Sequence, residues 1–381
     1  MKKTAISIGS NKSLVAGEKY VCSIELKIGE AGVPAGGKIR VALPCYWAWG
    51  PIQVSDPRKE NYVEVSASNP AVEFILWKES GHSLVIEVTR EGLRAGDKVK
   101  IQCGKSLPGK KSGVSVTRWA SITPYANIWA RVGASVDIAG EGKYVPVEGS
   151  PVILNVRSGK AKEIVITTPS CQECRREYEV KVAILDEHHN LVTDYEGCIK
   201  FKCTDKEAEF PREYIFKKED RGVCRFRIKL NNPGLYKIIA EDGKNKITAI
   251  SNPIVCETSF PSYQLFWGDI HGHSNLSDGV CSVNDYYIYA RDVAGLDFTA
   301  LTDHDAPWGR WVGKALSDSE WEMLKEKASQ YHREGRFVTF QAYEWTSNTH
   351  GHRNVYYLED APLYGAVLTP GVIHRKSYGI G

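Results

Sequence analysis

The 381-residue chain contains no run of about 18 consecutive apolar residues, which is what a membrane-spanning helix needs. It also lacks an excess of one charge, since 49 Lys and Arg residues stand against 46 Asp and Glu residues. Binding of polyanions rests on clustered positive charge, so this near balance argues against a general nucleic-acid binder. Residues 1–12 hold three lysines but no apolar core of about 7 residues, which argues against a signal peptide. We therefore expect a cytoplasmic protein.

Ten cysteines are present without an export signal beside them. In a chain of this length such cysteines are expected as reduced thiols rather than as a disulfide framework. The pair Cys171-x-x-Cys174 has the spacing with which zinc and redox motifs begin, but a second pair and a histidine at finger spacing are missing. We expect ordinary thiols there, with a metal or redox role as the alternative. Small buried side chains are expected where cysteines fall on the apolar phase of alternating segments, at Cys22, Cys103, Cys203 and Cys224.

Up to about residue 257, no long segment repeats apolar residues at helical spacing. Apolar and polar residues alternate instead, for example over 22–28, 98–103 and 178–184, which is typical of strands with one buried face. Such strands need a facing sheet, so we predict an all-β region made of β-sandwiches. Its length favours a division into a β-rich domain over 1–158 and an immunoglobulin-like β-sandwich over 159–257.

After Pro261 the pattern changes to alternating strands and helices. Short apolar runs predict buried strands, and apolar residues at helical spacing predict helices. The expected order is a strand over 265–270, a helix over 283–293, a strand over 296–301, a helix that opens with a capping box at Ser317 and Glu320 and ends at Gly335, and a strand over 337–343. A β-α-β-α-β order implies a parallel sheet or barrel, here in a domain over 262–381.

Side chains that bind metals follow each of these strands. His271 and His273 come after the first strand, His304 after the second, and Glu344 ends the third, with His352 a short loop further on. The carboxyl ends of parallel strands meet at one edge, so we expect these side chains to converge. His271 and His273 are two residues apart, which on an extended segment points both imidazoles to the same side. Imidazoles and carboxylates without thiolates suit Zn²⁺, Mn²⁺ or Fe.

Asp278 is a further candidate ligand in the same segment. It lies in Ser277-Asp278-Gly279, a tripeptide that also favours a turn, so a role as a turn residue is the alternative.

Several motifs together resemble those of a known family. They are His271-Gly272-His273 with Ser277-Asp278-Gly279, Thr302-Asp303-His304, and Glu344, and they resemble the first three motifs of the polymerase and histidinol phosphatase (PHP) superfamily. The residues around these motifs resemble those of a largely uncharacterised branch of this superfamily, whose members have β-rich N-terminal extensions. The resemblance covers about residues 262–360. It implies a distorted (β/α)7-like barrel that binds two or three divalent metal ions and usually hydrolyses phosphoesters.

Carried over by position, the resemblance implies that His271 and His273 hold one ion and that Glu344 bridges two. Asp278, His304 and His352 would complete further sites. The family pattern continues with another histidine and a late Asp-x-His motif, which this sequence lacks. The roughly 120 residues after Pro261 are also fewer than the 200 or more that such a barrel usually needs. We therefore expect an incomplete barrel, formed by the N-terminal portion of a PHP domain.

The expected activity is that of a metal-dependent hydrolase, most specifically a phosphoesterase that acts on a small-molecule or other phosphoester substrate through a metal-activated hydroxide. Asp303 and Asp305 are the candidate catalytic carboxylates. Asp303 is expected to orient a ligand imidazole, and either carboxylate could accept a proton. Arg353 and Arg310 are candidate contacts for a substrate phosphate.

Two other functions stay open on the sequence alone. A metal-activated hydroxide also attacks bonds other than phosphoesters, so the same site could hydrolyse a non-phosphate bond. Alternatively, the chain is a non-catalytic binding or scaffold protein, in which the β domains recognise a partner and the PHP section is truncated or degenerate.

Overall fold

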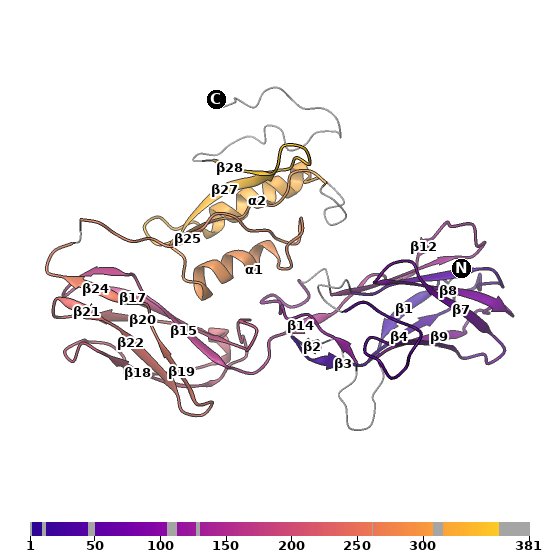
Figure 1. Ribbon diagram of the computed structural model, residues 1–381, viewed down its shortest axis with the longest axis horizontal. Helices are drawn as coiled ribbons and strands as arrows, with labels where there is room; N and C mark the ends of the chain where they lie inside the picture. Colours follow the sequence, from indigo (N-terminus) through magenta and orange to yellow (C-terminus); the bar gives the residue numbers. More distant parts are fainter. Residues whose placement is uncertain are drawn as a thin grey trace. The chain divides into compact units, whose positions relative to one another are not determined.

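The computed structural model of the protein describes residues 2–9, 13–44, 50–104, 113–126, 130–260, 262–307 and 315–357 (Figure 1). The chain divides into two compact units, Met1–Arg157 and Ser158–Gly381. None of the helices in the described ranges is long and apolar enough to cross a membrane.

The first unit is built from two antiparallel sheets. One has the strand order β1-β4-β9-β6, and the other has the order β12-β11-β5-β8-β7 with β13 also paired to β11. Two short pairs, β10 with β3 and β14 with β2, complete it. One buried hydrophobic cluster takes side chains from both sheets, among them Ile24 and Ile86. The bounds are β1 Ala5–Ile8, β2 Ser13–Val15, β3 Lys19–Tyr20, β4 Cys22–Lys27, β5 Lys38–Ala42, β6 Val63–Ala67, β7 Glu73–Lys78, β8 Ser83–Arg90, β9 Lys98–Cys103, β10 Val114–Ser115, β11 Arg131–Asp137, β12 Val145–Pro146, β13 Val152–Ile153 and β14 Asn155–Arg157.

The second unit opens with another region of strands, residues 159–257, which we call the middle β region. Its sheets have the orders β15-β17-β20, β19-β18-β22-β23 and β16-β24-β21, and a second hydrophobic cluster is buried among them. The bounds are β15 Glu163–Thr167, β16 Cys171–Glu173, β17 Glu177–Leu185, β18 Gly197–Cys203, β19 Glu213–Phe216, the 3-10 helix η1 Lys218–Asp220, β20 Val223–Lys229, β21 Gly234–Tyr236, β22 Ile238–Asp242, β23 Ile247–Ile250 and β24 Ile254–Glu257.

The predicted alternation of apolar and polar residues holds in these strands. In β4, Cys22, Ile24 and Leu26 are buried and the residues between them are partly exposed, and β9 shows the same alternation. The physical reason is that successive side chains of a strand point to opposite faces, and only one face meets the core. Cys22, Cys103 and Cys224 are buried as predicted. The prediction was wrong for Cys203, which is half-buried because it ends β18.

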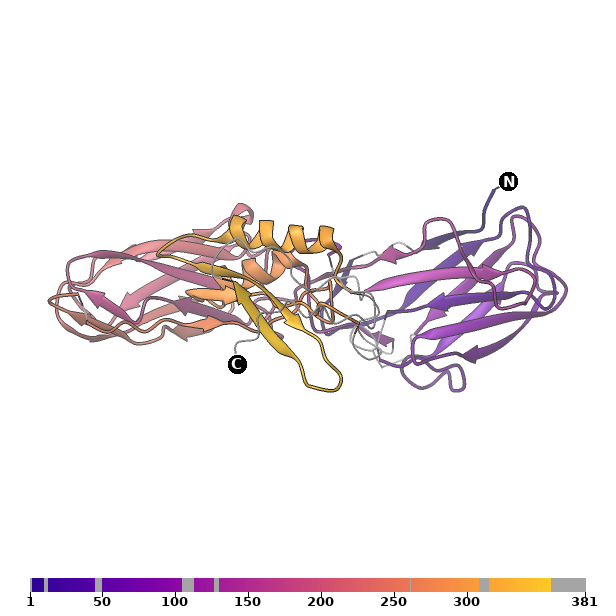
Figure 2. The ribbon, with the colours of Figure 1, turned by 90° about the horizontal axis from the view of Figure 1, so that it is seen from above.

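The last part of the second unit, which we call the α/β section, contains one sheet of order β25-β26-β27-β28. The strands β25, β26 and β27 are parallel, and β28 returns antiparallel to β27. In Figure 2, α2 runs alongside the hairpin of β27 and β28. The described residues form an open sheet, with no closed barrel among them. The bounds are β25 Gly268–Asp269, α1 Val283–Ile288, the π-helix η2 Tyr289–Val293, β26 Phe298–Ala300, α2 Asp318–Tyr331, β27 Val338–Trp345 and β28 Arg353–Tyr357.

Helix starts and stops in this section follow the sequence signals. The Ser317 hydroxyl accepts a hydrogen bond from the Glu320 amide, and the Glu320 carboxylate accepts one from the Ser317 amide, which is the predicted capping box. Ser282 caps α1 with its hydroxyl, which accepts a hydrogen bond from the amide of Asp285. The helix over 283–293 differs from the prediction in one respect. Its last five residues wind as a π-helix, and the Ala294 amide donates to the carbonyl of Tyr289.

The first strand of the α/β section is shorter and more exposed than predicted. Only Gly268–Asp269 pairs with β26, and the flanking Leu265, Phe266 and Trp267 are 52%, 61% and 58% exposed. The prediction of a buried strand over 265–270 was therefore wrong. The apolar run suggested a central strand, but β25 is the edge of the described sheet, so one side of it has no neighbour there.

The α/β section contacts the middle β region through polar side chains on β17 and β20. Arg225 forms an ion pair with Asp292, whose carboxylate also accepts hydrogen bonds from Arg291. The Lys181 ammonium donates to the carbonyl of Arg291 at 3.0 Å. These contacts attach the π-helix, and with it the loop that leads into β26, to the β-sheet beside it.

Candidate metal centre

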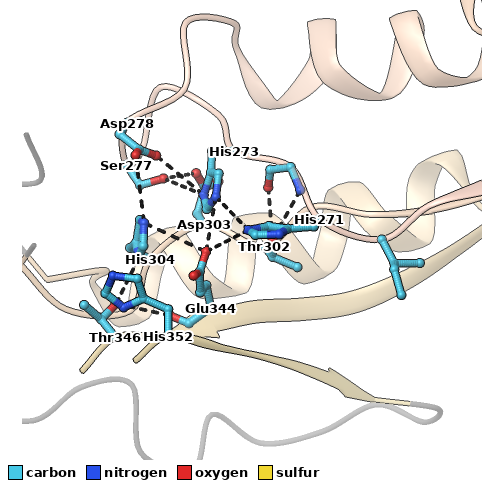
Figure 3. Close-up of polar contacts among 12 residues, drawn as sticks. His271, His273, Ser277, Asp278, Thr302, Asp303, His304, Glu344, Thr346 and His352 are labelled. Carbon is cyan, nitrogen blue, oxygen red and sulfur yellow. Dashed lines mark hydrogen bonds and ion pairs between the residues drawn. The ribbon is translucent and has the colours of Figure 1, made fainter. Parts of the chain in front are cut away.

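The candidate ligands come from four places along the chain that the sheet brings to one end. His271 and His273 lie on the extended segment after β25, and His304 lies four residues beyond the end of β26. Glu344 is near the end of β27, and a single bridge pairs it with His304. His352 precedes β28. The sheet order therefore brings together the side chains that the sequence singles out, as Figure 3 shows.

The carboxylate of Glu344 is the centre of this arrangement. Its Oε2 atom is 3.1 Å from Nε2 of His271, 3.2 Å from Nε2 of His273 and 3.9 Å from Nε2 of His304. The side chain of Glu344 is 6% exposed, and among the described residues its ion-pair partners are histidines rather than Lys or Arg. A buried carboxylate needs a compensating positive charge, and neutral imidazoles do not provide one.

The atoms around Glu344 are spaced as ligands of one ion. Nε2 of His271 is 3.2 Å from Nε2 of His273, in addition to the two distances to the carboxylate. A tetrahedral ion about 2.1 Å from each ligand atom sets those atoms about 3.4 Å apart. A carboxylate oxygen and an unprotonated imidazole nitrogen each offer a lone pair that can bind a metal ion. The donor set therefore fits a divalent metal ion.

A hydrogen-bonded chain fixes the imidazole of His273. The Ser277 hydroxyl donates to Oδ1 of Asp303 at 2.5 Å, so its oxygen is left to accept from Nδ1 of His273 at 3.4 Å. Asp303 is fully buried and also accepts hydrogen bonds from the amide and hydroxyl of Ser274, at 2.8 and 2.6 Å. With Nδ1 protonated, Nε2 of His273 keeps its lone pair toward Glu344. Burial raises the pKa of Asp303, although these hydrogen bonds oppose the shift.

Asp305 supports His304 through a hydroxyl residue, as Asp303 supports His273. Its carboxylate accepts a hydrogen bond of 2.8 Å from the amide of Thr346, and the Thr346 hydroxyl lies 3.0 Å from Nδ1 of His304. Burial raises the pKa of Asp305 to about 6, and hydrogen bonds from Thr346 limit the rise. Burial also lowers the pKa of His304, so its imidazole is neutral and able to act as a ligand. Neither Asp303 nor Asp305 belongs to a group of converging ligand atoms in the described residues.

Three overlapping groups of ligand atoms are present, each within 4.8 Å. They are His271 with His273 and Glu344; His273 with Asp278 and His304; and His304 with Glu344 and His352. An imidazole nitrogen binds one ion, whereas a carboxylate has two oxygens and can bridge two. The first and third groups share only Glu344, so they are compatible with two ions at once. The second group shares a histidine with each of the others.

Asp278 lies beside this second group with an unused oxygen. Its Oδ1 atom is buried and has no hydrogen-bond partner among the described residues. It is 3.6 Å from Nδ1 of His273, and Oδ2 is 3.9 Å from Nε2 of His304. Gly279 follows directly, and a Cβ atom there would lie 2.1 Å from the carbonyl oxygen of His273. The turn that the sequence suggested as the alternative role of Asp278 is therefore present. The same turn directs the Asp278 carboxylate to the ligand cluster.

Three site residues predicted from the sequence remain, His352, Arg353 and Arg310. The ring of His352 lies 5.0 Å from that of His304, and its Nδ1 accepts a hydrogen bond from the amide of Ser347. Arg353 is exposed, and its guanidinium donates to the carbonyls of His350 and Gly351 in the hairpin loop. Arg310 lies outside the described residues.

The sequence interpretation missed the two hydroxyl residues, Ser277 and Thr346. Each stands between a ligand imidazole and a buried carboxylate. Ser277 immediately precedes Asp278 and Thr346 follows Glu344 by two residues, but serine and threonine are common in loops. Their role depends on contacts across the sheet, which no local pattern shows.

Comparison with known proteins adds one family match and several relatives. Residues 308–372, which include Glu344 and His352, match a family described as a protein of unknown function, DUF3604. An uncharacterised protein of Chlamydia pneumoniae is 26% identical over 224 residues, covering 56% of this chain and 33% of that protein. Another, of Chlamydia trachomatis serovar D, is 22% identical over 317 residues, covering 81% and 48%. The chain thus spans half or less of the length of these relatives.

Solved structures show only distant likeness. The D00-D0 domain of intimin is 9% identical with a TM-score of 0.27, covering 67% of this chain and 99% of that one. A chain titled BspA_C_mut is 10% identical with a TM-score of 0.29, covering 68% and 99%. Likeness at this level does not define a shared fold.

Proposed function

We propose that the α/β section is of the PHP type and that the protein is a metal-dependent hydrolase, most specifically a phosphoesterase. The observation that carries the proposal is the convergence of two imidazole nitrogens on the buried carboxylate of Glu344, at 3.1 and 3.2 Å. Among the described residues, no Lys or Arg side chain pairs with this carboxylate. The arrangement therefore supports a metal ion as the positive charge that compensates Glu344.

The geometry favours two ions rather than three. One would be held by His271, His273 and Glu344. The other would be held by Glu344 and His304, with Asp278 and His352 on either side of His304. Zn²⁺, Mn²⁺ or Fe fits a donor set of imidazoles and carboxylates. Such ions, when bound, would activate a water molecule and neutralise the charge that develops on phosphate oxygens.

The chain's own residues then hold and orient these ligands. Asp303 acts through Ser277 on His273, and Asp305 supports Thr346, which contacts His304. We therefore propose that both carboxylates are positioning residues, which is the role expected from the sequence for Asp303, and that neither accepts a proton in the reaction. Asp303 has three donors on its carboxylate, which leaves it poorly suited to receive a further proton. Arg353 remains a proposed phosphate contact because it is exposed one residue from His352.

The test of the metal site is metal content. Wild type and the double variant His271→Ala with His273→Ala would be reconstituted with Zn²⁺, Mn²⁺ or Fe²⁺, desalted and measured by elemental mass spectrometry. The variant His332→Ala is a matched control, because this histidine is exposed at the end of α2. We expect up to two ions in wild type and in the control, and one fewer in the double variant. A wild type that stays metal-free after reconstitution would contradict the proposal and favour a binding or scaffold protein.

The test of the reaction is a substrate screen on the reconstituted chain. Phosphomonoester and phosphodiester chromogenic substrates would be compared with carboxylic ester substrates. Hydrolysis of a phosphoester that the double variant loses would support the phosphoesterase. Hydrolysis of the carboxylic esters alone would keep the metal site and replace the phosphoesterase by a hydrolase of another bond.

A further inference from the structure

Two cysteines of the middle β region are in direct contact. Cys174 follows β16 and Cys256 lies in β24, and their Sγ atoms are 2.6 Å apart although 82 residues separate them. Both are buried, at 9% and 2% exposed. A sulfur–sulfur bond is about 2.05 Å long, so the two atoms need to approach only slightly for a bond to form.

The backbone holds this pair in place. β16 and β24 are paired in parallel, with Gln172 opposite Cys256, and the amide of Cys174 donates to the carbonyl of Glu257 at 2.8 Å. On the other side of β24, Gly234 lies opposite Cys256. The sulfurs therefore meet because the strands that carry them are hydrogen-bonded neighbours, and not through a flexible loop.

Other cysteines provide a contrast. Cys22 and Cys103 also face each other across paired strands, β4 and β9, and both are fully buried. Among the described cysteines, it is the sulfurs of Cys174 and Cys256 that lie in contact. Strand pairing and burial alone do not produce such a contact, so it is specific to this pair.

We propose that Cys174 and Cys256 form a disulfide bond, so that the middle β region contains an oxidation site. The proposal is independent of the metal centre. The oxidant is a low-molecular-weight disulfide such as glutathione disulfide. One protein thiolate attacks it to give a mixed disulfide and one glutathione thiol, and the second protein thiolate then displaces the other glutathione thiol. Two protein thiols are oxidised and one glutathione disulfide is reduced.

The timing of this reaction follows from burial. Burial, together with a hydrogen bond to Cys174, raises the pKa of Cys256 to about 12, so its thiolate is scarce in the folded protein. Oxidation therefore takes place while the region folds, or when β24 opens locally. Cys171, which is half-buried at the start of β16, is the competing partner in the C-x-x-C spacing.

The bond would link β16 to the last strand of the middle β region. Beyond β24 the chain leads to Trp267, whose indole donates to the hydroxyl of Ser170 at 3.3 Å, next to β16. The cross-link would restrict the unfolded chain across a long loop and thereby stabilise the folded region. The sequence predicts that all cysteines are reduced thiols, as is usual in the cytoplasm. The proposed disulfide bond departs from that expectation for these two cysteines.

The experiment refolds the full chain in a glutathione redox buffer and, separately, with excess reductant. Free thiols are alkylated under denaturing conditions and counted by intact mass, and the linked peptides are mapped. The protein has ten cysteines, so we expect eight alkylated thiols after oxidation and one linked pair containing Cys174 and Cys256. Ten alkylated thiols after refolding in glutathione disulfide, or a pair that contains Cys171, would overturn the proposal.

Variants give a second readout. Cys171→Ala is the matched control for Cys174→Ala, because it removes a thiol only three residues away, at the start of the strand that Cys174 follows. Addition of reductant should lower the melting temperature of wild type and of Cys171→Ala by several degrees and leave Cys174→Ala and Cys256→Ala unchanged. If reductant lowers all four equally, the cross-link does not involve this pair. The mapping on wild type stands even if a variant fails to fold.

Discussion

Nδ1 of His304 lies 3.0 Å from the hydroxyl oxygen of Thr346, and that hydroxyl also reaches the carbonyl of Glu344 at 3.3 Å. The single hydroxyl hydrogen is donated to an oxygen acceptor, so the oxygen accepts the hydrogen on Nδ1. Nε2 of His304 therefore carries the lone pair, and it is this nitrogen that faces Glu344. The contact with Thr346 therefore favours the tautomer of His304 that a metal ligand requires.

Thr346→Val should weaken metal binding. Loss of the hydroxyl removes the acceptor for Nδ1, so the imidazole no longer has a preferred tautomer or orientation. Removal of such a supporting hydrogen bond typically costs about 10- to 100-fold in metal affinity. Chelator competition would measure the dissociation constant, and Thr346→Ser, which keeps the hydroxyl, should bind as wild type does. Equal affinities for the valine and serine variants would contradict the proposed role of this hydroxyl.

Glu344→Gln should lower the metal content of the protein more than the double variant His271→Ala with His273→Ala does. Glu344 belongs to both compatible ligand groups, whereas His271 and His273 belong to only one of them. We expect the glutamine variant to retain neither ion by elemental mass spectrometry. The control is Glu322→Gln, because this glutamate is 67% exposed on α2 and pairs only with Lys325 among the described residues. If Glu344→Gln keeps one full equivalent of metal, Glu344 is not the bridging ligand.

Asp292→Ala should destabilise the contact between the α/β section and the middle β region. The Asp292 side chain is 10% exposed and compensates Arg225 and Arg291. Loss of the carboxylate removes the ion-pair partner of Arg291 and leaves Arg225 with only its longer contact to Glu179, at 3.7 Å, among the described residues. We expect a loss of about 1–3 kcal/mol in the free energy of unfolding. Urea unfolding followed by circular dichroism would measure it.

The control for Asp292→Ala is Arg227→Ala. Arg227 lies two residues after Arg225 on β20, and its partner Glu177 is 3.5 Å away in an exposed pair. Exposed pairs of this kind contribute about 0–1 kcal/mol. A loss for Asp292→Ala no larger than that for Arg227→Ala would show that the buried contact does not stabilise this junction.

The stability of the middle β region should fall at acid pH through Asp242. Burial alone would raise the pKa of Asp242, but hydrogen bonds from Asn245 and from the Tyr195 hydroxyl outweigh it and lower the pKa below the ordinary value of 3.8. A carboxyl group with a lowered folded-state pKa stabilises the protein above its unfolded pKa, and this stabilisation is lost as the pH falls through the folded pKa.

The measurement compares wild type with Asp242→Asn by urea unfolding between pH 7 and pH 2. We expect the variant to be less stable by about 1.5–3 kcal/mol near pH 7, because hydrogen bonds to a charged group are lost. The difference should shrink as the pH falls below about 3.8. A difference that stays constant down to pH 2 would mean that the carboxylate charge is not what stabilises this turn.

Much of the fold was accessible from local patterns. Alternation of apolar residues located strands such as β4, β9 and β17, and the capping box located the start of α2. These patterns succeed because a strand or helix end depends mainly on its own residues. The buried strand over 265–270 was predicted wrongly, because burial depends on the neighbours of a strand and not on its own apolar side chains.

The sequence alone determined which residue types are available for the candidate centre, and the parallel order of the strands that carry them. The histidines His271, His273 and His304 follow strands, and Glu344 lies near the end of one. The ends of these strands must meet, and this is a consequence of β-α-β connectivity. Only the tertiary structure decided how these groups are used. It brought Asp303 into contact with Ser277 and Asp305 into contact with Thr346, and it brought the sulfurs of Cys174 and Cys256 together. It also left Oδ1 of Asp278 without a hydrogen bond from any part of the chain that the structure describes. Such relations depend on distances of a few ångströms between segments far apart in the chain, and these are set by packing rather than by local sequence.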